Sequence, residues 1–100
     1  MRTVILSKRA SKKLAKLFDY LEAEWSIKTR NDFLRKFQKS ITQIQKYPKS
    51  CPETNSVKDL RMLVITKQTS LFYKFDTKSI KIITIFDNRM NPKNIKKEVE

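Results

Sequence analysis

Hydrophobic residues recur every three or four positions in the first half of the chain, the spacing of one face of an α-helix. Between residues 8 and 25 they lie at Ala10, Leu14, Leu17, Phe18, Leu21 and Trp25. Between residues 29 and 47 they lie at Phe33, Leu34, Phe37, Ile41 and Ile44. The pattern predicts two amphipathic helices in an antiparallel hairpin, joined by about three to five residues. We expect Trp25 to pack in the core.

The ends of the predicted helices carry local signals. Ser7 can cap the first helix, and Thr29 followed by Asp32 resembles a capping box ahead of the second. Pro48 disfavours helical geometry in the residue before it, so the second helix should end near Tyr47. Residues 48–58 contain two prolines and several small polar residues, which indicates a connecting loop.

Four other segments have the composition of β-strands. They are residues 3–6, 60–66, 69–75 and 79–86, rich in β-branched, apolar or aromatic side chains. The last three are separated by short polar joints, which favours antiparallel pairing of neighbours. In the last strand, alternation predicts Ile80, Ile82, Thr84 and Phe86 on one face and Lys81, Ile83 and Ile85 on the other. Because both faces are mostly apolar, we expect this strand to be central in the sheet.

The predicted fold is therefore of the α+β class, in the order β-α-α-β-β-β. The antiparallel helical hairpin packs on one face of a small, mainly antiparallel four-stranded sheet. At 100 residues, the chain fits a single domain spanning residues 1–100. The other face of the sheet is expected to be exposed to water or covered by a partner chain.

Charge adds a preference for anionic partners. The chain has 23 Lys and Arg residues against 10 Asp and Glu, a formal net charge of +13. Such an excess favours contact with phosphates or acidic protein surfaces. The candidate contacts with the target or with nucleic acid are the helical cluster Lys8, Arg9, Lys12, Lys13 and Lys16, together with Lys67 and Lys74.

Missing residue types exclude several classes of chemistry. The chain has no histidine, which removes histidine-dependent triads, general bases and metal sites, and no glycine, which removes glycine-rich phosphate loops. Its one cysteine, Cys51, cannot form an internal disulfide or a thiolate metal site. We expect no cofactor and no metal. The chain also lacks a signal peptide or a long apolar run, so we expect a cytoplasmic protein without membrane contact.

The segments LFYKFD and IFDNRMNP, taken with the size, basicity and element order, resemble the RelE/ParE family of bacterial toxins. In that family an aromatic-Tyr pair precedes a last strand that ends in F-D-x-R-x-x-P. The matching residues here are Phe72, Tyr73, Phe86, Asp87, Arg89 and Pro92. The resemblance implies a toxin of a type II toxin-antitoxin module, bound by a cognate antitoxin, with operator DNA contacted through the toxin-antitoxin complex.

The resemblance also implies two possible targets. RelE-like members cleave messenger RNA in the ribosome, whereas ParE-like members poison DNA gyrase. For RNA cleavage, the candidate catalytic residues carried over are Arg61 and Arg89, with Tyr73 included only if the protein cleaves RNA; otherwise Tyr73 is a core residue. The chain departs from the RelE-like set at Leu63, Ser70 and Ile95, where basic residues and a tyrosine would stand.

These departures favour a ParE-like toxin that acts on gyrase. The alternatives are a ribosome-dependent mRNA endonuclease and a basic nucleic-acid-binding module without toxicity. Whether the protein is an enzyme stays open at this point.

Overall fold

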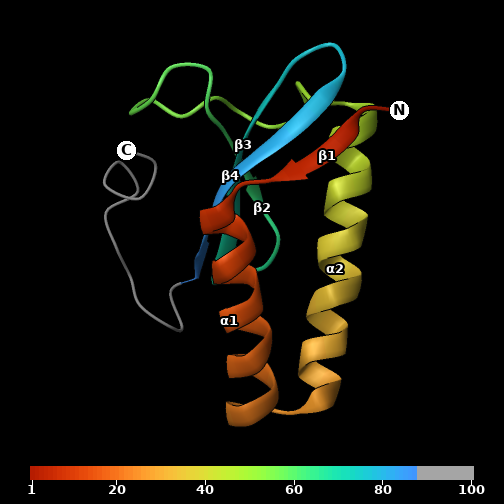
Figure 1. Cartoon of the computed structure of the whole chain (residues 1–100), viewed down its shortest axis with the longest axis vertical. Helices are drawn as coiled ribbons and strands as arrows, with labels where there is room; N and C mark the ends of the chain where they lie inside the picture. The colour runs from red at the N-terminus through yellow and green to blue at the C-terminus, as the bar shows by residue number, and fades with distance from the viewer. Residues whose placement is uncertain (88–100) are drawn as a thin grey trace.

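The order of elements agrees with the prediction. In the computed structural model, which describes residues 1–87, the chain forms β1 (Thr3–Leu6), α1 (Lys8–Glu24), α2 (Ile27–Lys46), β2 (Arg61–Val64), β3 (Thr69–Phe75) and β4 (Ser79–Asp87) (Figure 1). The β-α-α-β-β-β order and the α+β class are confirmed. Arg89 and the other residues of the family motif beyond Asp87 lie outside the described residues.

The four strands form one mixed sheet in the order β1-β4-β3-β2. β4 pairs antiparallel with β3, and β3 pairs antiparallel with β2, as adjacent hairpins should. β1 pairs parallel with β4, and both helices, β2 and β3 lie between these two neighbouring strands in the chain. The sheet is thus mainly antiparallel, and β4 is an inner strand as predicted.

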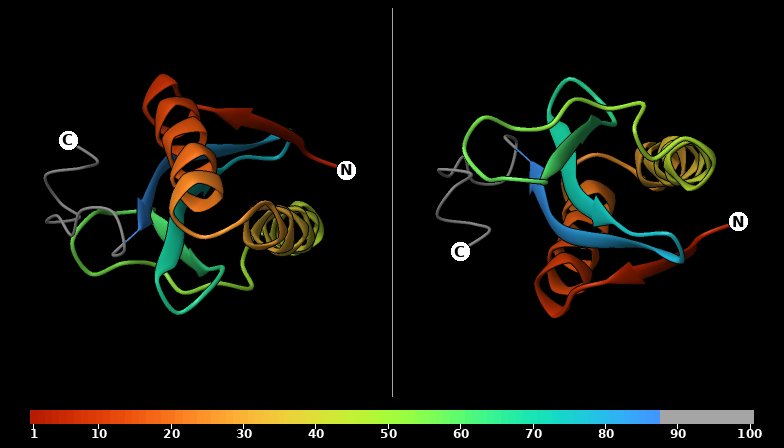
Figure 2. Two further views of the ribbon diagram at one scale, coloured as in Figure 1. Left: turned by 90° about the horizontal axis from the view of Figure 1, so that it is seen from below. Right: turned by 90° about the horizontal axis from the view of Figure 1, so that it is seen from above.

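Both helices cover the same face of the sheet (Figure 2). The core between the two layers joins one side of each helix to one face of β2, β3 and β4. Its buried members include Leu17, Leu21, Phe33, Phe37, Ile44, Leu63, Leu71, Tyr73, Ile80, Ile82 and Ile85. Phe18 and Phe33 meet edge to face between the helices, with ring centroids 5.9 Å apart.

The connection between the helices differs from the prediction. The cap of α2 is Ser26, whose extended backbone lets its Oγ accept the Thr29 N–H at 3.0 Å, so α2 begins at Ile27 and not after Thr29. Only residues 25 and 26 separate the helices, fewer than expected. The expectation that Trp25 packs in the core was also wrong. Trp25 is the C-cap of α1, so its non-helical backbone takes the side chain off the apolar stripe and leaves it 61% exposed.

The predicted alternation in the last strand holds only for its first half. Tyr73 pairs with Ile82 whereas Phe72 pairs with Thr84, so the register shifts at Ile83. Such a bulge moves the following residues to the opposite face. Ile85 therefore joins the core beside the helices, where the simple alternation had placed Thr84 and Phe86.

The far face of the sheet is not left open at its centre. Phe72 on that face is 1% exposed. A hollow beside it is lined by Met62 and by residues 52–56 of the long loop between α2 and β2. This aromatic is thus buried within the chain itself.

Candidate functional site

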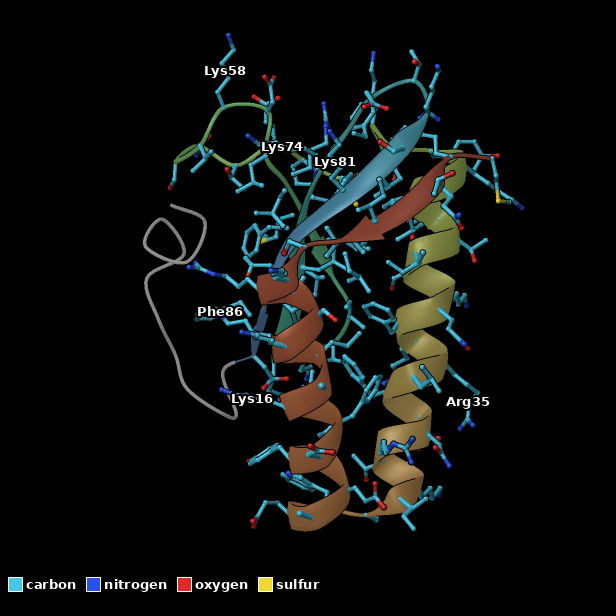
Figure 3. All side chains as sticks on the ribbon, viewed as in Figure 1. Lys16, Arg35, Lys58, Lys74, Lys81 and Phe86 are labelled. Carbon is cyan, nitrogen blue, oxygen red and sulfur yellow. The ribbon has the colours of Figure 1, made fainter. Side chains whose placement is uncertain are left out.

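The first helix presents five basic side chains along one side, Lys8, Arg9, Lys12, Lys13 and Lys16, here called the α1 basic stripe. At 100° per residue they fall within about 140° of the helix circumference, opposite the buried positions. All are exposed except the half-buried Lys13. Figure 3 shows Lys16 on the side of α1 that faces away from α2. The structure therefore brings these five predicted contact residues together on one surface.

The α1 basic stripe opposes the local electrostatics of its helix. The first turn of α1 contains no acidic residue, and each of its two cations, Lys8 and Arg9, costs about 0.3–1 kcal/mol against the helix dipole. Lys12 lies four residues from both Lys8 and Lys16, and like-charged pairs at that spacing are also mildly destabilising. No acidic residue occurs in the first 18 positions to offset them. The stripe is thus a surface whose charge lowers the stability of the fold.

A second charged surface lies at the end of the sheet, between the α2–β2 loop and the β3–β4 hairpin. This cleft of about 470 Å³, here called the sheet-end cleft, is lined by Lys49, Glu53, Asp59, Arg61, Lys74, Phe75, Asp76 and Lys81. Asp59 holds a left-handed backbone, with φ of 63°, in a chain that has no glycine to take that conformation.

Two lysines face each other across the strands in the sheet-end cleft. Lys74 of β3 pairs directly with Lys81 of β4, and Figure 3 shows both near the top of the sheet. Like charges in this arrangement repel. Asp76 partly offsets the repulsion, since its carboxylate lies 4.0 Å from Lys81 Nζ. Hydrogen bonds from the backbone N–H groups of Lys78 and Ser79 hold the pKa of the Asp76 carboxyl below its usual value.

Phe75 is flanked by two guanidinium groups at one wall of this cleft. The Cζ atoms of Arg2 and Arg61 each lie 5.7 Å from the ring centroid. Each guanidinium also donates to a backbone carbonyl, Arg2 to Asp76 at 2.8 Å and Arg61 to Cys51 at 2.6 Å. Arg61 is accordingly half-buried and fixed by contacts within the fold.

Tyr73 is a core residue. Its side chain is fully buried, and its hydroxyl donates to the backbone oxygen of Pro48 at 2.7 Å. Burial, and next the neighbouring Cys51 thiol, raises the pKa of the Tyr73 hydroxyl well above its ordinary range. The phenol therefore stays protonated and serves to anchor the start of the α2–β2 loop to the sheet.

The other predicted site residues are dispersed. Lys67 lies in the turn between β2 and β3, at the opposite end of β3 from Lys74, so the two do not share a surface. Sequence reasoning missed Lys49 and Lys81, which line the sheet-end cleft with Lys74. The short joint at residues 76–78 indicates that β3 and β4 pair as a hairpin. This pairing could have placed Lys81 opposite Lys74, but only with the correct strand register.

The described residues also bear on metal and membrane binding. Residues 1–87 contain no group of three or more Cys, Asp or Glu side chains close enough to hold a metal ion. In the same residues, neither helix is long and apolar enough to cross a bilayer.

A mostly apolar groove of about 330 Å³ lies between β1 and α2, on the helix side of the sheet. It is lined by Val4, Leu6, Phe37, Gln38, Ile41, Thr42 and Ile82. β1 is an edge strand, and its Ile5 and Leu6 are 48% and 40% exposed. This corner of the molecule therefore combines an edge strand with partly exposed apolar side chains.

Comparison with solved structures finds the same fold in toxin-antitoxin systems. A chain of the chromosomal ParDE system from P. aeruginosa matches with a TM-score of 0.71 at 15% identity, covering 87% of this chain and 96% of that one. A chain of the E. coli DinJ-YafQ complex matches with a TM-score of 0.61 at 16% identity, covering 91% and 98%. At these identities the structures show the fold alone, and no curated protein matches.

The sequence itself matches one family model. That model is described as the ParE toxin of the type II toxin-antitoxin system parDE, and it matches residues 4–92, nearly the whole chain. The resemblance drawn from the segments LFYKFD and IFDNRMNP is thereby confirmed. The chain belongs to the ParE toxin family of type II toxin-antitoxin systems.

Proposed function

We propose that this ParE-family toxin arrests growth by poisoning DNA gyrase and that it does not cleave RNA. A cognate antitoxin neutralises it. Gyrase acts on DNA in the cytoplasm, so the proposal places the toxin there.

The observation that carries the proposal is the placement of Tyr73 and Arg61. Cleavage of RNA by attack of a 2'-hydroxyl needs a base for that hydroxyl, cations for the phosphorane and an acid for the leaving oxygen. Tyr73 is buried, bonded to Pro48 and protonated, so it is unable to exchange protons with a substrate. Arg61 is half-buried and donates to the Cys51 carbonyl.

The remaining charged groups of the sheet-end cleft are lysines and the carboxylates of Glu53, Asp59 and Asp76, and they do not reproduce the RelE-like set. Lys74 and Lys81 supply positive charge but no base, and Asp76 is held by its own turn. Leu63, which stands where RelE-like enzymes have a basic residue, is 5% exposed and belongs to the core. Of the positions carried over from the RelE-like set, residues 1–87 thus provide no group free to exchange a proton with a substrate, because Tyr73 is buried and Leu63 is apolar.

The experiment compares two reactions of the purified full-length chain. A gyrase poison increases the linear DNA recovered when supercoiled plasmid, gyrase and toxin are quenched with detergent, and added antitoxin reverses the effect. A ribosome-dependent nuclease instead produces discrete cuts in a transcript in a translating extract. Transcript cuts without any effect on gyrase cleavage would overturn the proposal.

Arg61→Lys and Arg61→Ala provide a matched pair. If Arg61 only supports the fold, gyrase cleavage per folded molecule stays near the wild-type level in both variants, while Arg61→Ala lowers the melting temperature. Loss of cleavage in folded Arg61→Lys would show instead that the guanidinium contacts the target.

A further inference from the structure

We propose that the α1 basic stripe binds the phosphate backbone of duplex DNA directly. The inference rests on the proposed action on gyrase, whose substrate is DNA, and it gives the toxin a contact with the DNA segment held in that complex.

Four of the five residues of the stripe carry exposed positive charge. Lys8, Arg9, Lys12 and Lys16 are exposed, and none forms an ion pair with a carboxylate of residues 1–87. The acidic residues of α1 lie in its second half, from Asp19 onward. The N-terminal half of the helix is therefore a surface of one sign, which attracts a polyanion through the release of its counterions.

The arrangement of these charges also destabilises the helix locally. Basic residues in the first turn oppose the helix dipole, and the capping serine Ser7 is followed directly by Lys8 and Arg9. A solvated face that served only to keep the chain dispersed could carry these charges on the last turn, where they would stabilise the helix. Their position at the unfavourable end indicates that the charge serves binding.

The spacing of the charges along the helix matches the dimensions of duplex DNA. Lys8 and Lys16 are eight residues apart, which is about 12 Å along a helix axis, and the major groove of B-DNA is about 12 Å wide. A helix laid across the groove can therefore reach phosphates of both strands. The opposite side of α1 packs on the sheet through Leu17 and Leu21, which holds the stripe as a rigid row. Duplex DNA satisfies this spacing better than an isolated acidic side chain does.

The chain offers a matched control for charge alone. Lys28, Lys36, Lys39 and Lys46 are four exposed lysines of α2. Figure 3 shows another exposed cation of this helix, Arg35, on the side of α2 away from α1. The stripe variant carries Lys8→Gln, Arg9→Gln, Lys12→Gln and Lys16→Gln. The control variant carries Lys28→Gln, Lys36→Gln, Lys39→Gln and Lys46→Gln, so both lose the same formal charge.

The assay is fluorescence anisotropy of a labelled duplex of mixed sequence, titrated with each full-length toxin at several salt concentrations. Loss of four phosphate contacts should reduce the slope of log affinity against log salt by about 3 to 4. At low salt we expect the stripe variant to bind about tenfold or more weakly than wild type. The control variant should keep most of the slope, and the stripe variant should melt at or above the wild-type temperature, which excludes unfolding as the cause.

Two results would overturn the inference. One is an equal loss of DNA affinity in both variants, which would mean that only total charge matters. The other is unchanged DNA binding by the stripe variant with weakened binding to gyrase in the absence of DNA, which would assign the stripe to an acidic protein surface. Failure of the wild-type toxin to raise gyrase cleavage would instead refute the proposed function, because DNA binding by anisotropy is measured without gyrase.

Discussion

Replacement of Tyr73 by phenylalanine tests whether the tyrosine hydroxyl stabilises the fold or takes part in catalysis. Phenylalanine keeps the ring in the core and removes only the hydroxyl that donates to the Pro48 carbonyl at 2.7 Å. Because Pro48 is buried, its oxygen is left without that donor, and such a loss costs about 1–3 kcal/mol of unfolding free energy. In a domain of this size each kcal/mol corresponds to roughly 4–8 °C in melting temperature.

The assay is urea unfolding of wild type and Tyr73→Phe, followed by circular dichroism, at neutral and alkaline pH. Folding raises the pKa of Tyr73 above its ordinary value of 10.0, so the unfolded chain loses this proton first. The stability that the hydroxyl provides is therefore complete below pH 10 and declines above it, by up to about 1.4 kcal/mol per pH unit. The difference in unfolding free energy between wild type and Tyr73→Phe should therefore narrow as the pH rises past 10.

Growth arrest on induced expression is the second readout. A core role predicts that Tyr73→Phe, destabilised but folded, still arrests growth. Equal stability at neutral pH together with complete loss of toxicity would refute the reasoning, since it would place the hydroxyl in the chemistry and not in the packing.

Three further changes test other parts of the structure. Ser7→Ala removes the α1 cap and the bond from Ser7 Oγ to the Ile83 carbonyl, and should lower the unfolding free energy by about 1–2 kcal/mol in urea titrations. Asp76→Asn should be less stable than wild type at neutral pH, and the difference should narrow as pH falls below the ordinary carboxyl value of 3.8 in thermal melts, because folding lowers this pKa. Trp25→Ala should change stability by less than about 0.5 kcal/mol because the side chain is 61% exposed. A loss above about 2 kcal/mol would contradict that exposure.

Local signals were sufficient to predict most of the fold. The 3.6-residue period predicted the two helices. The β-branched runs placed β1, β3 and the start of β4 at their observed residues. The start of α2 was missed because Ser26 and Thr29 are both competent caps, and the choice between them depends on where α1 ends. Trp25 was misplaced for the same reason, since one residue beyond the helix end no longer follows the helical period.

The strand register was beyond what the sequence could give. Residues 80–86 are mostly apolar on both faces, so a bulge at Ile83 leaves no clear break in the hydrophobic pattern. The same ambiguity hid the opposition of Lys74 and Lys81, because a shift of one residue in the pairing would put their side chains on opposite faces. The pairing of distant strands depends on how the sheet packs against the helices, and local sequence patterns do not contain that information. The sheet-end cleft could not be predicted for the same reason.

The sheet-end cleft and the α1 basic stripe are held in place by different contacts, so a mutation can affect one without the other. The sheet-end cleft depends on the α2–β2 loop, which has little regular structure and is held by Tyr73 on Pro48 and by Arg61 on Cys51. The α1 basic stripe depends on a capped helix packed on β4 and needs neither contact. A substitution such as Tyr73→Phe should therefore loosen the cleft while leaving the DNA affinity of the stripe intact. If a folded Tyr73→Phe protein lost DNA affinity as well, the cleft and the stripe would have to act as one site, and the division of the toxin into a rigid DNA-facing helix and a loop-dependent cleft would be wrong.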